Sequence, residues 1–257
     1  MTSTSISFDR AAGFYDQTRG LPAHVSDEVA SLASELIGAD AGALEIGVGT
    51  GRITKPLIAQ GAHMTGVDLS RAMMARIRQD VPRAALINGD ITRLPLASAS
   101  FDAVIAVHIF HLVGDWRGAL AEARRMLRPG GVLLRGHNDR PPSPIEEMRD
   151  FLRERLAALG LPQTPIGAVE NDIESALIES GATMEERRTR TWSSPITFAQ
   201  DIDGIQQRVW SSLWRVSDDA LAEVVPEMRA FVLKRFGSLD ATVDVPQQFV
   251  WKRFAWA

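Results

Sequence analysis

The chain of 257 residues has 45% hydrophobic and 23% charged residues and a formal net charge of −4 at pH 7, a composition typical of a soluble globular protein. The negative charge gives no support for nucleic-acid binding, and no apolar run reaches the ~20 residues of a membrane span. The N-terminus lacks a secretory signal. We therefore expect a cytoplasmic protein without nucleic-acid or membrane partners. There is no cysteine and no His, Asp or Glu spacing that suggests a metal, and the oligomeric state is left open.

Residues 1–24 are polar and irregular, and we interpret them as an N-terminal arm. The arm contains the only tyrosine, Tyr15, and Arg19 follows four residues later. A docked arm with Tyr15 simply packed is one interpretation. A helix is expected to begin at Ser26, a good N-cap, and to end at Gly38.

A short apolar run, residues 43–46, leads into a glycine-rich turn and then into helical apolar spacing. The glycines, at every second position, are Gly47, Gly49 and Gly51. This pattern indicates a buried parallel strand that turns sharply into a helix. Three glycines in the turn indicate backbone conformations or close approaches that a Cβ would block, as when a ligand lies against the backbone. An ordinary tight turn is the alternative.

The glycine spacing and the preceding residue favour one kind of ligand. Dinucleotide-binding folds place the third glycine three residues after the second, but that position is Arg52 here. Glu45 stands before the glycines and suits a cationic ligand better than a phosphate. The stretch from Glu45 resembles the [D/E]-x-G-x-G-x-G motif of the class I S-adenosylmethionine (SAM)-dependent methyltransferases. The resemblance implies an α/β, doubly wound, Rossmann-like sheet of seven strands in the order 3-2-1-4-5-7-6, with SAM as cofactor and S-adenosylhomocysteine (SAH) as product.

The N-terminal arm is similar to the same family. Its segment from Phe8 to Arg19 looks like the F-x-x-x-A-x-x-Y-D-x-x-R leader of small-molecule, type 11-like methyltransferases. In the family this leader folds over the cofactor. The resemblance therefore implies that Tyr15 and Arg19 approach the methionine end of SAM.

A second strand is expected over residues 62–68, with Asp68 at its carboxyl end. Ligands of open α/β sheets bind outside these strand ends, and a carboxylate there can accept hydrogen bonds from both ribose hydroxyls. Asp68 alone does not separate SAM from NAD. Its neighbour Leu69 is included among the cofactor contacts. Ser70 caps the next helix, whose Met73 either lines an adenine pocket or packs in the core.

The third and fourth predicted strands end at further cofactor contacts. Residues 84–87 lead to Asp90 and Ile91. The resemblance implies that Asp90 accepts a hydrogen bond from the adenine amino group and that Ile91 lies against the ring, although an Asp after Asn-Gly is also a common turn residue. The fourth strand, residues 101–107, ends at Val107, which we include in the cofactor site.

Two histidines follow the fourth strand and are the candidate catalytic residues. Transfer from an already activated sulfonium needs in-line positioning of the acceptor and, for some acceptors, removal of a proton. His108 is the preferred base or substrate contact. His111 lies in a stretch similar to the family's L-H-H, where the histidine often supports the loop. We expect an extended chain here, so the two side chains point to opposite sides and have different roles.

The second half of the chain indicates shape more than chemistry. The motif L-R-P-G-G at 127–131 indicates a helix end and a turn before a fifth strand. A polar edge strand is expected at 184–192 and an apolar interior strand at 249–256. Between the last two lies a helical insertion, residues 195–240. One amphipathic helix is capped by Thr197 and its apolar stripe reaches Trp214, and another is capped by Ser217. The insertion is interpreted as a lid over the substrate. A dimer interface, or a patch that enlarges the core, is the alternative.

We therefore expect a single domain, residues 1–257, that transfers a methyl group from SAM to a small or medium-sized organic acceptor. An NAD-linked oxidoreductase is the rival; it shares the glycines and Asp68 but gives no role to Glu45 or Asp90. A non-catalytic SAM-binding protein is a second rival, which would bind SAH without turnover. The sequence does not indicate the acceptor or its reacting atom.

Overall fold

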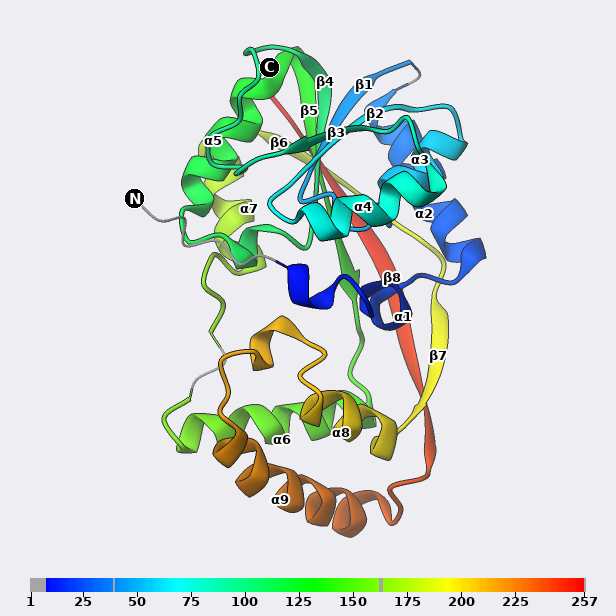
Figure 1. Cartoon of the computed structure of the whole chain (residues 1–257), viewed down its shortest axis with the longest axis vertical. Helices are drawn as coiled ribbons and strands as arrows, with labels where there is room; N and C mark the ends of the chain where they lie inside the picture. The colour runs from blue at the N-terminus through cyan, green and yellow to red at the C-terminus, as the bar shows by residue number, and fades with distance from the viewer. Residues whose placement is uncertain (1–7, 39, 162–163, 257) are drawn as a thin grey trace. The chain divides into compact units, whose positions relative to one another are not determined.

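The computed structural model describes residues 8–38, 40–161 and 164–256, and Figure 1 shows the course of the chain. Residues 1–7 of the predicted arm lie outside the described residues. The strands are β1 (Gly42–Ile46), β2 (His63–Asp68), β3 (Ala85–Asn88), β4 (Phe101–Val107), β5 (Leu127–Asp139), β6 (Thr183–Arg188), β7 (Trp192–Thr197) and β8 (Thr242–Ala255). The helices are α1 (Tyr15–Arg19), α2 (Ala23–Ile37), α3 (Thr54–Ala59), α4 (Arg71–Asp80), α5 (Trp116–Met126), α6 (Pro144–Ala158), α7 (Glu170–Glu179), α8 (Phe198–Gln206) and α9 (Asp218–Phe236), with short 3-10 helices η1 (Asp9–Ala11), η2 (Phe110–Leu112) and η3 (Ser211–Leu213).

The strands form a mixed sheet in the order β3-β2-β1-β4-β5-β8-β6. The pairs from β3 to β5 are parallel, whereas β6 pairs with β8 antiparallel. This order confirms the predicted doubly wound sheet, with β8 in the place of the predicted seventh strand. β7 is additional and pairs with the first part of β8. The carboxyl ends of β1, β2 and β4 lie at one edge of the sheet because these strands are parallel neighbours.

The chain divides into two compact units. The first comprises Met1–Asn138, Ile166–Arg190 and Phe249–Ala257, and the second Asp139–Pro165 and Thr191–Gln248. In the first unit, one face of the sheet packs against α5 and α7 in a single apolar core cluster. On the other face, the indole N–H of Trp251 in β8 donates a hydrogen bond to the carbonyl of Val29 in α2 (3.0 Å). The buried sheet therefore holds the strand ends of the first unit in place.

The second unit has its own apolar core, built from α6, α8, α9 and the strand segments of that unit. Phe151 of α6 stacks on Phe231 of α9 with ring centroids 4.6 Å apart. Asp201 of α8 is fully buried and accepts a hydrogen bond from Arg149 of α6 (2.5 Å). A buried carboxylate needs such a partner, so this pair connects the two helices.

Both predicted helix starts in residues 195–240 are confirmed. Thr197 forms a complete capping box with Gln200, and the Ser217 hydroxyl accepts the N–H of Ala220. The predicted length of the first helix is wrong, because α8 ends at Gln206 and not beyond position 210. Arg208 has φ +51, a left-handed conformation that stops a helix of L-residues.

Two other local predictions are wrong. α2 begins at Ala23 after Pro22, whose carbonyl accepts the N–H of Ser26, so Ser26 lies inside the helix rather than capping it. The strand after α5 begins at Leu127, where a helix end and a turn were expected. The glycines are accommodated by an irregularity in the β4–β5 pairing, and Gly130 has φ +78.

No helix among residues 8–38, 40–161 and 164–256 is long and apolar enough to cross a membrane. Within the same ranges, no group of three or more His, Asp or Glu side chains is arranged to hold a metal ion.

Candidate functional site

The glycine-rich turn after β1 has the conformation that its sequence indicates. Gly47, Gly49 and Gly51 have φ of +73, +55 and +81, in the left-handed region that favours glycine. A Cβ on Gly47 would lie 2.6 Å from the side chain of Ile109. At Gly49 the nearest atoms would be Cε of Met73, at 3.5 Å, and the Gly47 carbonyl oxygen, at 4.0 Å, which are ordinary contact distances. No protein atom therefore crowds the backbone at Gly49 as Ile109 does at Gly47.

Asp68, at the carboxyl end of β2, holds the glycine turn. One carboxylate oxygen accepts the N–H of Gly49 and the other accepts the N–H of Ser70, each at 2.8 Å. Burial raises the pKa of Asp68, and these two N–H donors oppose the increase. A carboxylate oxygen can accept more than one hydrogen bond, so Asp68 can serve the turn and a hydroxyl of a ligand together.

Glu45 in β1 lies under the glycine turn and is only 3% exposed. It accepts a hydrogen bond from the Thr54 hydroxyl, at the start of α3. Burial raises the pKa of Glu45 to about 8, although Thr54 and the positive charge of Arg52 both lower it. Without a further cation, the carboxyl group is therefore mainly protonated at pH 7. A positively charged ligand nearby would favour its ionised form.

The N-terminal arm lies against the glycine turn. Hydrogen bonds connect the two, from the Thr50 hydroxyl to Asp16 (2.5 Å), from the Ser70 hydroxyl to Asp9 (2.5 Å) and from Arg52 Nη1 to the Arg19 carbonyl (3.0 Å). Tyr15 is half-buried and meets Phe8 edge-on, with ring centroids 6.0 Å apart. The structure therefore brings the predicted arm residues to the predicted cofactor turn.

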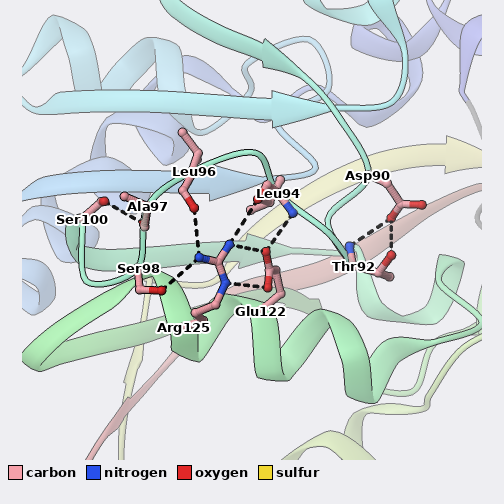
Figure 2. Close-up of polar contacts among 9 residues, drawn as sticks. All are labelled: Asp90, Thr92, Leu94, Leu96, Ala97, Ser98, Ser100, Glu122 and Arg125. Atoms are coloured by element: carbon pink, nitrogen blue, oxygen red, sulfur yellow. Dashed lines mark hydrogen bonds and ion pairs between the residues drawn. The ribbon is translucent and has the colours of Figure 1, made fainter.

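The remaining predicted cofactor contacts lie around the same strand ends. Asp90 follows β3, and its Oδ1 accepts both the N–H and the hydroxyl of Thr92, at 2.9 Å each (Figure 2). Asp90 thus does form the turn that its sequence allows. Three of the predicted apolar contacts are buried, namely Met73, Ile91 and Val107, and Leu69 is half-buried. Ile91 belongs to the main core cluster, so part of its surface packs on the protein itself.

An arginine–glutamate pair in α5 fastens the loop that follows Asp90. Figure 2 shows Arg125 donating to the carbonyls of Leu94 (3.1 Å) and Leu96 (2.9 Å) and pairing with Glu122 (2.5 Å). Glu122 in turn accepts the N–H of Leu94 (2.8 Å). These contacts join the loop backbone to α5 and so limit the positions that the loop can take.

The structure corrects the expected backbone at the two histidines. The chain is not extended after β4, because His108 has φ +49 and η2 begins at Phe110. A non-glycine residue in the left-handed region is uncommon and often lies at a functional site. Gly136 lies opposite Val107 in β5, and Asn138 two residues later contacts the His108 ring. The sequence pattern did not show this turn because strand alternation says nothing of the residue after the strand.

Both histidines are held neutral by their surroundings. Nε2 of His108 lies 3.1 Å from Oδ1 of Asn138, and the Asn138 backbone N–H also points to it (3.3 Å). Burial, helped by the charge of Arg52, lowers the pKa of His108 well below 6.5. Burial also lowers the pKa of His111, against the opposing charge of Glu170. The two contacts need opposite tautomers of the neutral ring. Nε2 accepts the Asn138 backbone N–H when Nδ1 carries the proton, and it donates to Oδ1 of Asn138 when Nδ1 is the free, basic atom.

Several site residues escaped the sequence interpretation. Thr50 joins the glycine turn to the arm, Thr54 donates to Glu45, and Asn138 contacts His108. Small polar residues at such positions are common in any turn, so the sequence did not single them out. Arg135 could have been identified from the sequence, because it is a charged residue directly after the apolar residues 132–134.

The residues at this edge of the sheet fit a SAM-like ligand. The backbone at Gly49 is not crowded by protein atoms, and the ionisation of the buried Glu45 would be favoured by a cation. The carboxylate of Asp68 can accept from a hydroxyl. These groups would hold a molecule that is positively charged at one end and carries hydroxyls further along.

The comparisons with known proteins agree with this geometry. Residues 44–134 match the methyltransferase domain family. The chain is similar to demethylmenaquinone methyltransferase of Tropheryma whipplei, with 35% identity over 135 residues that cover 49% of this chain and 55% of that protein. It is also similar to an uncharacterized methyltransferase of Mycobacterium bovis, with 28% identity over 204 residues that cover 79% and 77% of the two chains. The chain therefore spans about half the length of the first of these relatives.

A solved structure shows the same fold. The phosphoethanolamine N-methyltransferase 2 of Haemonchus contortus, in complex with phosphomonomethylethanolamine and SAH, superposes with a TM-score of 0.55 at 18% identity, covering 96% of this chain and 57% of that one. The family match identifies residues 44–134 as a methyltransferase domain, and the strand order is the one implied by the resemblance to class I methyltransferases. The resemblance seen in the sequence is confirmed.

Proposed function

We propose that the protein is a SAM-dependent methyltransferase that acts on a small or medium-sized organic acceptor. The observation that carries this proposal is the glycine turn, held between Asp68 and the N-terminal arm, with the protonatable Glu45 beneath it. A pyrophosphate-binding turn would gain nothing from a buried carboxyl group at this position. A ligand with a cationic end would.

Each residue of the site has a separate role in this proposal. Bound SAM would supply a methyl group on a sulfonium that is already activated for displacement. Glu45 would ionise and balance positive charge, Asp68 would accept from the ribose hydroxyls, and Asp90 would accept from the adenine amino group. Most of the rate enhancement would then come from holding the acceptor in line with the methyl group.

His108 is the proposed contact to the acceptor. As a neutral imidazole it can accept a proton from the acceptor at neutral pH, and its hydrogen bond to Asn138 fixes the ring. His111 lies in η2, where its carbonyl accepts the N–H of Gly167 (3.0 Å). We assign His111 the supporting role, because its backbone joins two segments of the chain.

The similarity to demethylmenaquinone methyltransferase supports an organic acceptor of modest size rather than a macromolecule. Labelling with isotopic methyl-SAM tests the proposal. The protein is incubated with cell extract, and the products are compared by mass spectrometry with those of a Gly49→Val control. We expect at least one labelled product that needs the intact protein. Saturable SAH binding without a labelled product in any extract would instead show a non-catalytic SAM-binding protein.

We also propose that residues 195–240 act as a lid for the acceptor. Their helices are amphipathic and bury their apolar faces in the core of the second unit. When an acceptor identified by labelling joins SAH, the fluorescence of Trp210 or Trp214 should change and proteolysis within this stretch should slow. Unchanged fluorescence and proteolysis would favour an interface between copies of the chain.

A further inference from the structure

Arg135 is a buried cation with an incomplete set of partners. It lies in β5, directly after the apolar residues Val132, Leu133 and Leu134, and is 4% exposed. Its Nη2 donates to Glu170 at 2.6 Å, whereas its buried Nη1 has no hydrogen-bond partner among the described residues. A buried guanidinium donor without an acceptor costs free energy, so an arginine kept in this position calls for a second acceptor.

Arg135 lies next to the candidate catalytic histidines. It is paired in register with Ala106, two residues before His108. Its guanidinium carbon lies 5.6 Å from the ring centroid of Phe110, which immediately precedes His111. The unpaired donor therefore belongs to the same edge of the sheet as the proposed acceptor site.

Helix α7 begins beside Arg135, and its N-cap residue makes no side-chain hydrogen bond to the first turn. Its N-cap residue is Val169, which is half-exposed and provides no side-chain acceptor for the first N–H groups. The preceding loop packs closely on η2, since the N–H of Gly167 donates to the His111 carbonyl and a Cβ on Gly167 would lie 1.9 Å from the Phe110 carbonyl oxygen. Free N–H groups at a helix start attract anions.

Glu170 is the carboxylate that pairs with Arg135 in this structure, and it lies at the start of α7. It is the first residue of α7, and its side chain is 46% exposed while that of Arg135 is 5% exposed. A half-exposed glutamate can rotate into water at small cost, whereas Arg135 cannot leave the strand. An arriving carboxylate could therefore take the place of Glu170 and also satisfy Nη1, because guanidinium binds carboxylates through two donors.

We propose that Arg135 and the uncapped start of α7 bind a carboxylate carried by the methyl acceptor, and that Glu170 occupies this position until the acceptor arrives. The inference rests on the proposed methyl transfer and narrows its substrates to organic acids. A purely structural Arg135–Glu170 pair would explain the contact between β5 and α7. It would not explain the unpaired Nη1 or the uncapped helix.

Calorimetric titration of the SAH-saturated protein with malonate tests the proposal, with malonamide as the neutral probe and inorganic phosphate as the rival anion. The variants are Arg135→Met, Arg135→Lys and Glu170→Gln. The matched control is Arg128→Met, which removes a half-exposed arginine from the same strand that pairs with Asp102 at 2.7 Å.

We expect malonate to bind saturably and malonamide not to bind. Arg135→Met should weaken malonate about ten- to a hundred-fold, and Arg135→Lys should weaken it less. Glu170→Gln should strengthen it, since the competing carboxylate is gone, and Arg128→Met should leave it unchanged. SAH affinity should be the same in all four variants.

Failure of malonate to bind, tighter binding of phosphate, or equal malonate affinity in Arg135→Met and Arg128→Met would overturn the proposal. Weaker malonate binding in Glu170→Gln would also overturn it, and this variant decides the question if Arg135→Met does not fold. A protein that binds malonate but not SAH would contradict the proposed function and leave the carboxylate site standing.

Discussion

Replacement of Asp68 by alanine should weaken both the fold and the binding of SAH. The carboxylate accepts two backbone N–H groups, from Gly49 and Ser70, at 2.8 Å each. A hydrogen bond to a charged group contributes about 1.5–3 kcal/mol, but burial raises the pKa of Asp68 and so takes back part of that gain. We therefore expect the free energy of unfolding to fall by about 2 kcal/mol for both bonds together.

The loss of SAH affinity should be about ten- to a hundred-fold, because a ribose hydroxyl also loses a charged acceptor. Urea unfolding of the ligand-free protein measures the first effect and calorimetry with SAH measures the second. Asp102→Ala is the matched control, since Asp102 accepts the N–H of Gly42 at 2.9 Å at the opposite end of β1. This control should lose some stability and keep its SAH affinity. Equal SAH affinities in the Asp68→Ala variant and the unaltered protein would refute the ribose assignment.

Three further predictions concern neighbouring positions. The pKa of Glu45 is raised from 4.5 to about 8, so protonation of Glu45 stabilises the fold fully below about pH 4.5. This contribution is lost as the pH rises to about 8, and the free energy of unfolding then falls by at most about 1.4 kcal/mol per pH unit. Glu45→Gln should flatten this slope in urea unfolding across the range, and an unchanged slope would contradict the pKa. Gly49→Val should abolish SAH binding, because a β-branched residue resists φ +55 and would occupy the space proposed for the ligand. Gly130→Val, at φ +78 in the irregular start of β5, should bind SAH normally. SAH binding by Gly49→Val would contradict a ligand site at the glycine turn. His108→Asn should keep the fold, since asparagine tolerates the left-handed region, and lose about 10²–10⁴-fold in methyl-transfer rate with SAH affinity intact. Because the pKa of His108 is lowered, the rate of the unaltered protein should decline only well below pH 6.5, and full activity of the variant would exclude His108 as the base.

The sheet order and the cofactor edge could be predicted because they depend on patterns within short segments. β4 was predicted at its observed bounds from one apolar run, and the glycines alone indicated the turn after β1. β7 could not be predicted in this way. Its residues Ser193, Ser194 and Pro195 show no apolar alternation, and the strand forms because β8, about fifty residues later, offers an edge to pair with.

The site was predicted less completely for a similar reason. Asp68 was expected from its place at a strand end, but its bond to Gly49 depends on the β1–β2 register, which the sequence does not show. The left-handed turn at His108 has no recognisable pattern in its own segment. The role of Arg135 could not be predicted because its partner, Glu170, lies 35 residues away in the sequence and reaches Arg135 only through the packing of α7.

Calorimetric titration with SAH and with NAD tests the central claim most directly. Both ligands carry adenosine, so both can use Asp68, but only SAH carries the amino-acid end that the buried Glu45 is proposed to face. We expect saturable binding of SAH that becomes tighter as the pH rises toward 8, and no comparable binding of NAD. Tight binding of NAD with no response to SAH would contradict it.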